Sequence, residues 1–499
     1  IGHLYKILPE IQKKGPFNVV QSPATPKERT SNVMFRRLLP ALLLIPTLVS
    51  AQQSLTDTYR EPAGQILGAA MTDVEGWKKL EYLTIEIGHR LSGSTGLERA
   101  IDWAAEGMEK EGLHVRKLPV KVPHWVRGEE SLQLLAPVER ELSILGLGRS
   151  IGTPQGGITA PVVAVTSFEE LEQLDRSDVE GKIVLYAVPW EGYGKTVKYR
   201  GAGASRAAEK GAVAALVRSA TGRSLYTPHT GAMKYDEAFP KIPAAAVTVE
   251  DAEWMRRSIA NGHEVRVKLE MGAHELPDAD SFNVVAEIRG SEKPEEVVVM
   301  GGHYDSWDVG QGAHDDGAAC MAAWHALTII HRLGLQPRRT LRVVLWTNEE
   351  NGLRGGKAYR EWVGDEIESH VAAIEMDGGA ERPVGFGLGI GMGDQDAPDA
   401  AYEKALSTLT QIGVLLDGID ASLMERGGGG ADIGPLMKDG VPGMGLRTVG
   451  EHYFDWHHTE ADTLDKVDPV NFRKAVATLG VTGYVLADMP GTLPRGDSE

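Results

Sequence analysis

Histidine, aspartate and glutamate side chains recur in the second half of this sequence, and most of them directly follow a run of apolar residues. Imidazole and carboxylate groups are the side chains that bind zinc and related divalent ions. In open α/β sheets, side chains that follow the strands collect at the carboxyl edge, so we expect these groups to converge. In chain order, the candidates are His303, Asp305, Asp315, Glu349, Glu350, Asp377 and His458.

Each candidate also has a purely structural explanation. Asp315 or Asp316 could cap a helix that begins near residue 318, although capping needs only one of them. Asp377 precedes two glycines and could mark a turn, and His458 closely follows aromatic residues and could join a buried cluster. Two adjacent glutamates after an apolar strand are harder to explain, because burying unpaired carboxylates costs free energy. The metal-site interpretation therefore depends on the whole set.

The number of candidate ligands indicates two metal ions. Two imidazoles and three carboxylates exceed one tetrahedral site, and they fit a pair of ions ~3.5–4 Å apart that share a carboxylate and hold a water between them. Neighbouring strand residues point in opposite directions, so one of Glu349 and Glu350 can bind metal while the other accepts the proton of that water. Asp305 is placed to accept a hydrogen bond from the second ring nitrogen of His303. Mixed nitrogen and oxygen ligands favour zinc.

The elements that would position these residues alternate between strand and helix after residue 280. This alternation predicts an α/β fold with a mostly parallel central sheet flanked by helices. Strands are expected at 282–288, 297–300, 340–347, 371–376, 385–390 and 441–447, and helices at 318–333, 355–363, 398–412 and 470–487.

Residues 126–280 have a different pattern and contain no ligand-like cluster. Short strand-like runs occur at 161–165, 182–188, 212–217, 243–249 and 265–269, with one clear helix near 203–210. We interpret this block as an inserted β-rich domain that ends in a Pro- and Asp-containing joint at 276–280. The catalytic domain is then discontinuous and comprises residues 52–125, largely helical, and 281–499.

The N-terminal region predicts export. Residues 34–51 combine a basic start, an apolar run of about a dozen residues and a small-residue cleavage site after Ala51, which is typical of a signal peptide. Residues 1–33 are interpreted as a non-native or disordered extension. We therefore expect a secreted or periplasmic protein that is not membrane-bound after cleavage.

Composition excludes some partners. Removing residues 1–51, which hold seven Lys or Arg and two Asp or Glu, moves the net charge from −18 to −23. Such an acidic chain is a poor match for nucleic acid. The single cysteine, Cys320, excludes an internal disulfide, and we expect it to be a buried apolar residue.

The ordered motifs resemble the secreted di-zinc exopeptidases of peptidase family M28. The matching pieces span about residues 57–489, and they are His303-x-Asp305, Asp315-Asp316-Gly317, Asn348-Glu349-Glu350, Met376-Asp377-Gly378 and His458-Thr459. The resemblance implies the zinc exopeptidase fold with a protease-associated domain at 126–280. It also implies two zinc ions per chain, short peptide substrates and a homodimer.

The resemblance assigns roles to individual residues. Asp315 would bridge the two zinc ions, and the Asp315–Asp316 peptide would be cis. Glu349 would be the general base, Asp305 would orient His303, and His457 stands where some relatives place a tyrosine that steadies the reaction intermediate. We hypothesise that His457 supplies this function. One zinc ion would be completed by Glu350 and His458, and the other by His303 and Asp377.

Alternative functions remain open from the sequence. A binding protein on the same fold would lack activity, but the ligand set and Glu349 are complete. A glutaminyl cyclase-like acyltransferase typically has Ser after the bridging Asp, where this chain has Asp316. The single G-x-S-x-G match, at 148–152, is followed by Pro154 and further glycines where a nucleophile elbow needs a helix.

The choice between aminopeptidase, carboxypeptidase and dipeptidase also stays open. The Gly-rich loop at 425–432 is a candidate for substrate contact, with Arg426 available to bind a carboxylate. An exposed connector is an equally good interpretation of that loop.

Overall fold

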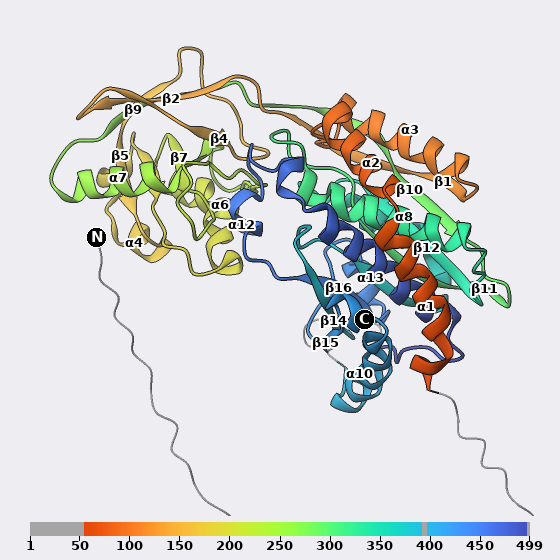
Figure 1. Ribbon diagram of the computed structural model, residues 1–499. Coiled ribbons are helices and arrows are strands. Elements are labelled where there is room, and N and C mark those ends of the chain that lie inside the picture. The colour runs from red at the N-terminus through yellow and green to blue at the C-terminus, as the bar shows by residue number, and fades with distance from the viewer. Residues whose placement is uncertain (1–53, 392–396, 497–499) are drawn as a thin grey trace, which may run out of the picture. The chain divides into compact units, whose positions relative to one another are not determined.

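The computed structural model describes residues 54–391 and 397–496 (Figure 1). The predicted extension and signal peptide at 1–51 lie outside these residues and stay predictions. The described strands form two eight-stranded sheets, one in the predicted catalytic domain and one in the predicted insert. Among these residues, no helix combines the length and apolar character that a membrane crossing requires.

The catalytic domain is built on a sheet with the strand order β1-β10-β12-β11-β13-β16-β14-β15. Its middle strands, β12, β11, β13 and β16, are parallel, whereas β1, β10 and β14 pair antiparallel with a neighbour. The mostly parallel centre is therefore confirmed. The strands are β1 (His114–Val126), β10 (His274–Ile288), β11 (Lys293–His303), β12 (Arg339–Trp346), β13 (His370–Glu375), β14 (Pro383–Gly389), β15 (Leu423–Arg426) and β16 (Gly443–Thr448).

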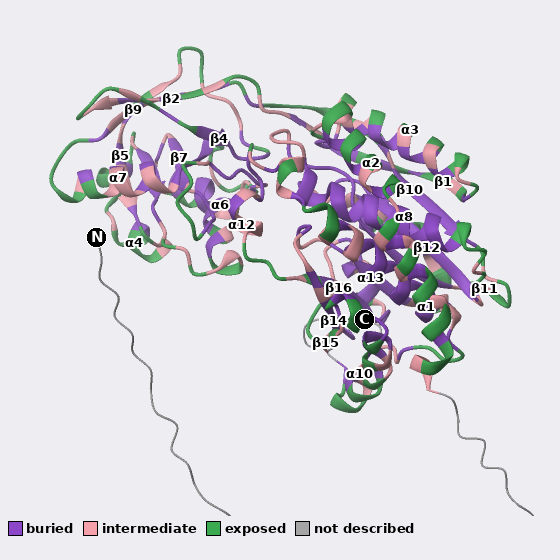
Figure 2. Cartoon of the chain, viewed as in Figure 1, coloured by how far each residue is buried: buried purple, intermediate pink, exposed green. Residues whose placement is uncertain are grey.

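Helices cover both faces of this sheet, as the continuous apolar strands predict. The α8 helix is almost entirely buried (Figure 2). Along β11, Val298 and Met300 join the core cluster that includes α8 and α13, while Val297 and Val299 join a second cluster with α9 and α11. The helical segments are α1 (Leu55–Thr72), α2 (Glu75–Glu81), η1 (Tyr82–Ile87), α3 (Thr95–Lys110), η2 (Ala313–Gly317), α8 (Ala318–Arg332), α9 (Arg354–Val363), η3 (Gly364–Ser369), α10 (Asp399–Val414), η5 (Asp417–Ile419), α11 (Gly434–Lys438), α12 (Tyr453–Trp456), η6 (Leu464–Lys466) and α13 (Pro469–Asp488).

The insert is an α/β domain with its own sheet, whose strand order is β3-β2-β9-β5-β6-β7-β8-β4. Strands β5 to β8 are parallel, and separate apolar clusters lie on the two faces. Helices α4, α5 and α7 were not expected, and α7 begins after Thr248, whose hydroxyl caps it. The elements are β2 (Glu130–Ala136), β3 (Arg140–Leu142), β4 (Ile144–Gly146), β5 (Ile158–Val165), α4 (Phe168–Gln173), α5 (Arg176–Val179), β6 (Ile183–Tyr186), α6 (Tyr193–Glu209), β7 (Ala214–Arg218), β8 (Ala244–Val247), α7 (Val249–Ala260) and β9 (Arg266–Met271).

The expected joint at 276–280 is wrong. These residues lie inside β10, which pairs antiparallel with β1 from His114 opposite Glu287 to Val126 opposite His274. Pro277 is tolerated because it falls where the register shifts, in a part of β10 that pairs with β1 alone. The chain therefore enters and leaves the insert along a continuous two-stranded ribbon. The exact domain limits stay a prediction.

Candidate metal centre

Parallel strands deliver most of the predicted site residues to one edge of the catalytic sheet. His303 ends β11, Glu350 follows β12 and Asp377 follows β13. Asp315 comes from η2, immediately before α8, and His458 follows α12. Apart from Asp377, which is half-buried, these five side chains are buried. Strand ends and helix starts thus bring distant parts of the chain to one point.

One group of side chains gathers around His303. Its Nε2 atom lies 3.0 Å from Oδ1 of Asp315 and 3.6 Å from Oδ1 of Asp377. The three ligand atoms lie within 4.8 Å of one another, an arrangement that can hold a metal ion. This is the set that the family resemblance assigns to one zinc ion.

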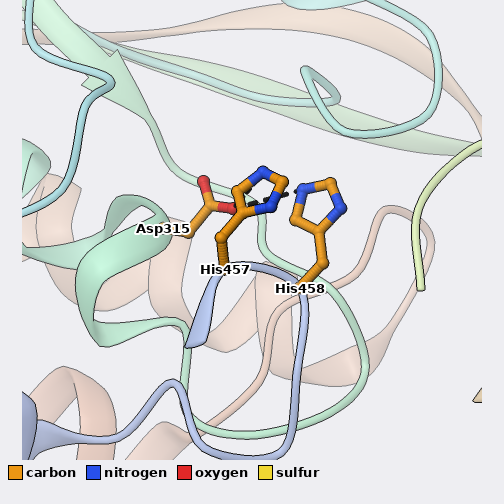
Figure 3. A group of neighbouring side chains, drawn as sticks. All are labelled: Asp315, His457 and His458. Atoms are coloured by element: carbon orange, nitrogen blue, oxygen red, sulfur yellow. Dashed lines mark ion pairs between the residues drawn. The ribbon is translucent and has the colours of Figure 1, made fainter. Parts of the chain in front are cut away.

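A second group gathers on the other oxygen of the same aspartate. Nε2 of His458 lies 3.2 Å from Oδ2 of Asp315 and 3.0 Å from Oε2 of Glu350. His457 stacks on His458 with ring centroids 3.6 Å apart, and its Nε2 is 3.6 Å from the same Asp315 oxygen (Figure 3). Asp315 therefore faces both groups, as a bridging ligand must.

The buried oxygens of the site fit metal ions. Oδ2 of Asp315 and Oε1 of Glu350 are buried, and no described group forms a hydrogen bond of acceptable geometry with either. Burial raises the pKa of Asp315, but the imidazoles of His303 and His458 beside its carboxylate lower it by more, so its pKa lies well below the usual value. An ionised carboxylate without complete hydrogen bonding is costly in a protein interior, and a bound cation compensates for that cost.

The hydrogen bond that orients His303 differs from the expected one. Nδ1 of His303 lies 3.0 Å from the backbone oxygen of Asp305, whereas the Asp305 carboxylate is 3.9 Å away. That carboxylate instead accepts from the backbone N–H groups of Glu349, at 2.9 Å, and Glu350, at 3.3 Å. These loop amides have passed the end of β12 and need a partner outside the sheet. Asp305 therefore positions the two glutamates.

Glu349 lies at a cavity of about 500 Å³ together with His303, Asp315 and Asp377. Burial is the main cause that raises the pKa of Glu349 well above its usual value, and the charges of Asp377 and its other carboxylate neighbours add to it, whereas His303 opposes the shift. A carboxylate with a raised pKa is a stronger base, which suits proton transfer near neutral pH.

Several residues that organise the site were missed by the sequence analysis. Asp462 accepts hydrogen bonds from the backbone N–H groups of Ala313, His314 and Asp315 and so fixes the loop that carries the shared ligand. The buried Arg90 donates to the backbone oxygens of Tyr304, Gln311 and Gly312. Neither residue belongs to a motif with metal-ligand spacing, so only their contacts reveal the role.

The insert also reaches the cavity, which its lack of a ligand cluster did not suggest. Tyr193, Arg200 and Ala232 from the insert line the cavity beside Tyr453 and Phe454 from the catalytic domain. The lining of the cavity is thus formed jointly by both parts of the chain.

Two further predictions, on the Asp315–Asp316 peptide and on Cys320, are confirmed, whereas the one on Arg426 is not supported. The Asp315–Asp316 peptide is cis, and Cys320 is buried, as expected. Arg426 does not belong to the cavity lining: it pairs with Asp399 at 2.7 Å and lies over the ring of Tyr402. Its position on β15 directs the guanidinium to α10, so the expectation that it binds substrate is not supported.

Comparison with known proteins identifies both parts of the chain. The family model described as Peptidase family M28 matches residues 283–481, and the PA domain model matches residues 158–255. Carboxypeptidase Q from Mus musculus is 45% identical over 420 residues, which cover 84% of this chain and 87% of the relative. Carboxypeptidase Q from Homo sapiens is 44% identical over 420 residues, which cover 84% of this chain and 86% of the relative.

Solved structures agree with this assignment. The crystal structure of a peptidase M28 precursor from Shewanella amazonensis aligns with a TM-score of 0.82 and 35% identity, covering 88% of this chain and 98% of that one. The zinc aminopeptidase BSAP from Bacillus subtilis shares the fold at a TM-score of 0.61 and 17% identity, covering 85% and 97% of the two chains. The chain therefore belongs to peptidase family M28 and is a metallo-exopeptidase that contains a PA domain.

Proposed function

We propose that this protein is a di-zinc exopeptidase that hydrolyses dipeptides or short peptides near a free terminus. The observation that carries the proposal is Asp315, which lies between two groups of imidazole and carboxylate ligands at the cavity. The cavity volume of about 500 Å³ is in the range that holds a small ligand, so it supports short substrates.

We assign each site residue a role in metal binding or proton transfer. Asp315 would be shared, His303 and Asp377 would hold one zinc ion, and Glu350 and His458 the other. Bound zinc would polarise the scissile carbonyl and lower the pKa of water. Glu349 would accept the proton of the attacking water and pass it to the leaving amine. Asp305 would keep the Glu349 side chain in place through the backbone of its loop.

Export is part of the proposal, because residues 34–51 have the composition of a signal peptide. The protein would act outside the cytoplasm, in a secreted or periplasmic form that begins at Gln52. Association into a homodimer stays a prediction, and size measurement in solution would test it.

The first test is product identification by mass spectrometry from a pool of unblocked, N-blocked and C-amidated di- to tetrapeptides. Zinc-loaded protein should trim them, and the blocked end that stops trimming identifies the terminus that is read. Glu349→Gln should abolish trimming, while the matched control Glu361→Gln, at an exposed position on α9, should not.

Other outcomes of this experiment point elsewhere. Closure of N-terminal glutamine to pyroglutamate without peptide cleavage would favour a glutaminyl cyclase-like acyltransferase. Intact peptides throughout would favour a binding protein. A chelator should stop trimming and added zinc should restore it, so cleavage that survives complete chelation would contradict the metal site.

A further inference from the structure

The insert contacts a metal-ligand candidate directly through the backbone of Thr230, which lies between β7 and β8 within the segment matched by the PA domain model. The Thr230 carbonyl oxygen is 3.2 Å from Nδ1 of His458. The Thr230 N–H donates to the backbone oxygen of His458 at 3.0 Å. This reciprocal pair of hydrogen bonds fixes both the backbone and the ring of His458 against the insert.

The carbonyl also selects the tautomer of His458. A carbonyl oxygen only accepts hydrogen bonds, so Nδ1 carries the proton of this bond, and a neutral His458 then keeps its lone pair on Nε2. Nε2 is the atom that faces Asp315 and Glu350. His303 is held in the same way, but its acceptor is the backbone oxygen of Asp305 in the catalytic domain. The two ligand imidazoles therefore depend on carbonyls from different domains.

Arg200 on α6 holds the Thr230 carbonyl in place. Its Nη1 donates to that oxygen at 3.1 Å, and its Nη2 donates to the hydroxyl of Tyr193 at 2.7 Å. Nη1 is also 3.3 Å from Nδ1 of His458, but with Nδ1 protonated both atoms are donors, so they converge on the shared acceptor. Arg200 is buried, with 8% of its surface exposed.

Gly231 allows the Arg200 guanidinium to approach the backbone closely at this point. A Cβ atom on Gly231 would lie 2.2 Å from Cζ of Arg200, and the φ angle of Gly231 is +137°. Any other residue would displace the guanidinium from the carbonyl that it binds.

We propose that Arg200 is a positioning residue for the metal ligand His458, and that the insert thereby sets how tightly the half of the site formed by Glu350 and His458 holds its ion. The inference rests on the proposed function, because it requires zinc at this centre. Outer hydrogen-bond partners of metal-bound histidines typically contribute about 10- to 100-fold to metal affinity.

The test compares zinc binding by the full chain and by Arg200→Met, measured by competition with a chromophoric chelator. Arg206→Met is the matched control, because Arg206 lies on the same helix with a half-exposed side chain, and its ion pairs with Glu172 and Glu209 are 3.9 Å long. We expect Arg200→Met to lower the affinity for one of the two zinc equivalents about 10- to 100-fold and to leave the affinity for the other unchanged. Arg206→Met should bind both zinc equivalents with the wild-type affinity.

Two further measurements separate positioning from simple loss of structure. Arg200→Lys keeps a donor for the Thr230 carbonyl and should recover part of the affinity. Peptide trimming by Arg200→Met should return as free zinc is raised, whereas a misfolded protein would stay inactive at any zinc concentration. Loss of both equivalents together, or inactivity that zinc does not rescue, would overturn the positioning role.

The failure of this inference is distinguishable from the failure of the proposed function. If the wild type binds zinc and trims peptides while Arg200→Met binds zinc equally well, only the role of Arg200 is wrong. If the wild type binds no zinc, the proposed function itself is wrong.

Discussion

The carboxylate of Asp305 accepts a hydrogen bond of 2.9 Å from the backbone N–H of Glu349, the proposed general base. A second bond of 3.3 Å comes from the N–H of Glu350. One buried side chain thus holds the loop that supplies both a base and a ligand. Its contribution to catalysis should pass through these residues, because the backbone oxygen of Asp305, and not its carboxylate, holds His303.

Asp305→Asn should therefore lower kcat about 10- to 100-fold. The amide keeps one acceptor oxygen, but its NH₂ group faces an N–H donor of the loop. A double-mutant cycle with Glu349→Gln provides the check, because residues that act as a unit are not additive. The Asp305 change should have little further effect in the Glu349→Gln background. If Asp305→Asn lowered kcat in the Glu349→Gln background as much as in the wild type, Asp305 would not act through Glu349.

Asp315→Asn should remove zinc from both halves of the site, whereas Asp377→Asn should affect only one. The reason is that Asp315 faces both imidazoles through its two oxygens, whereas Asp377 lies beside His303 and belongs to that group of ligands. Metal content after dialysis, measured by plasma mass spectrometry, distinguishes the outcomes. Equal metal losses in the two variants would argue against a shared ligand.

His457 should act as a neutral donor toward the oxyanion that develops on the substrate. Burial is the main cause that lowers the pKa of His457 well below its usual value, so it is uncharged at neutral pH. His457→Phe keeps an aromatic ring beside Tyr193 and Tyr453 but removes the N–H. If this donor resembles those of known oxyanion holes, kcat should fall about 10²- to 10³-fold with zinc content unchanged.

Two results would remove this hypothesis. Unchanged turnover in His457→Phe would show that no such hydrogen bond is made. Loss of zinc would instead identify His457 as a ligand, a role that its Nε2 atom, 3.6 Å from Asp315, can also fill.

His370 should contribute a loss of stability in the zinc-free protein as the pH drops from 6.5 to 4. Burial, with the nearby charge of Arg342, lowers the pKa of His370 to about 4, against 6.5 in the unfolded chain. Between these values the unfolded state binds the extra proton, so acidification favours unfolding until the folded pKa is reached. One such proton changes the free energy of unfolding by about 1.4 kcal/mol per pH unit.

His370→Gln should remove this contribution and change the slope of the unfolding free energy against pH by up to that amount, which urea denaturation between pH 4.5 and 6 measures. His263→Gln, at an exposed position, is the control and should keep the wild-type slope. Identical slopes in His370→Gln and the wild type would show that His370 is not held neutral by the fold.

The outline of the catalytic domain could be predicted because its strands are apolar on both faces. The alternation of Val297 and Val299 with Val298 and Met300 between two clusters shows why such a run must lie under helices on either side. The strand at 276–280 could not be predicted, since Pro277 and its acidic neighbours favour a turn locally. Pairing with β1 overrides that local preference.

The residue types and their order past the strands determined which side chains gather, because parallel strands deliver successive loops to one edge of a sheet. The sequence could not determine which backbone carbonyl accepts a hydrogen bond from each ligand imidazole. His303 donates to the backbone carbonyl of Asp305, and His458 donates to that of Thr230. Neither acceptor atom depends on the type of its side chain. Backbone oxygens are identical at every position, so only tertiary packing decides which of them faces an imidazole.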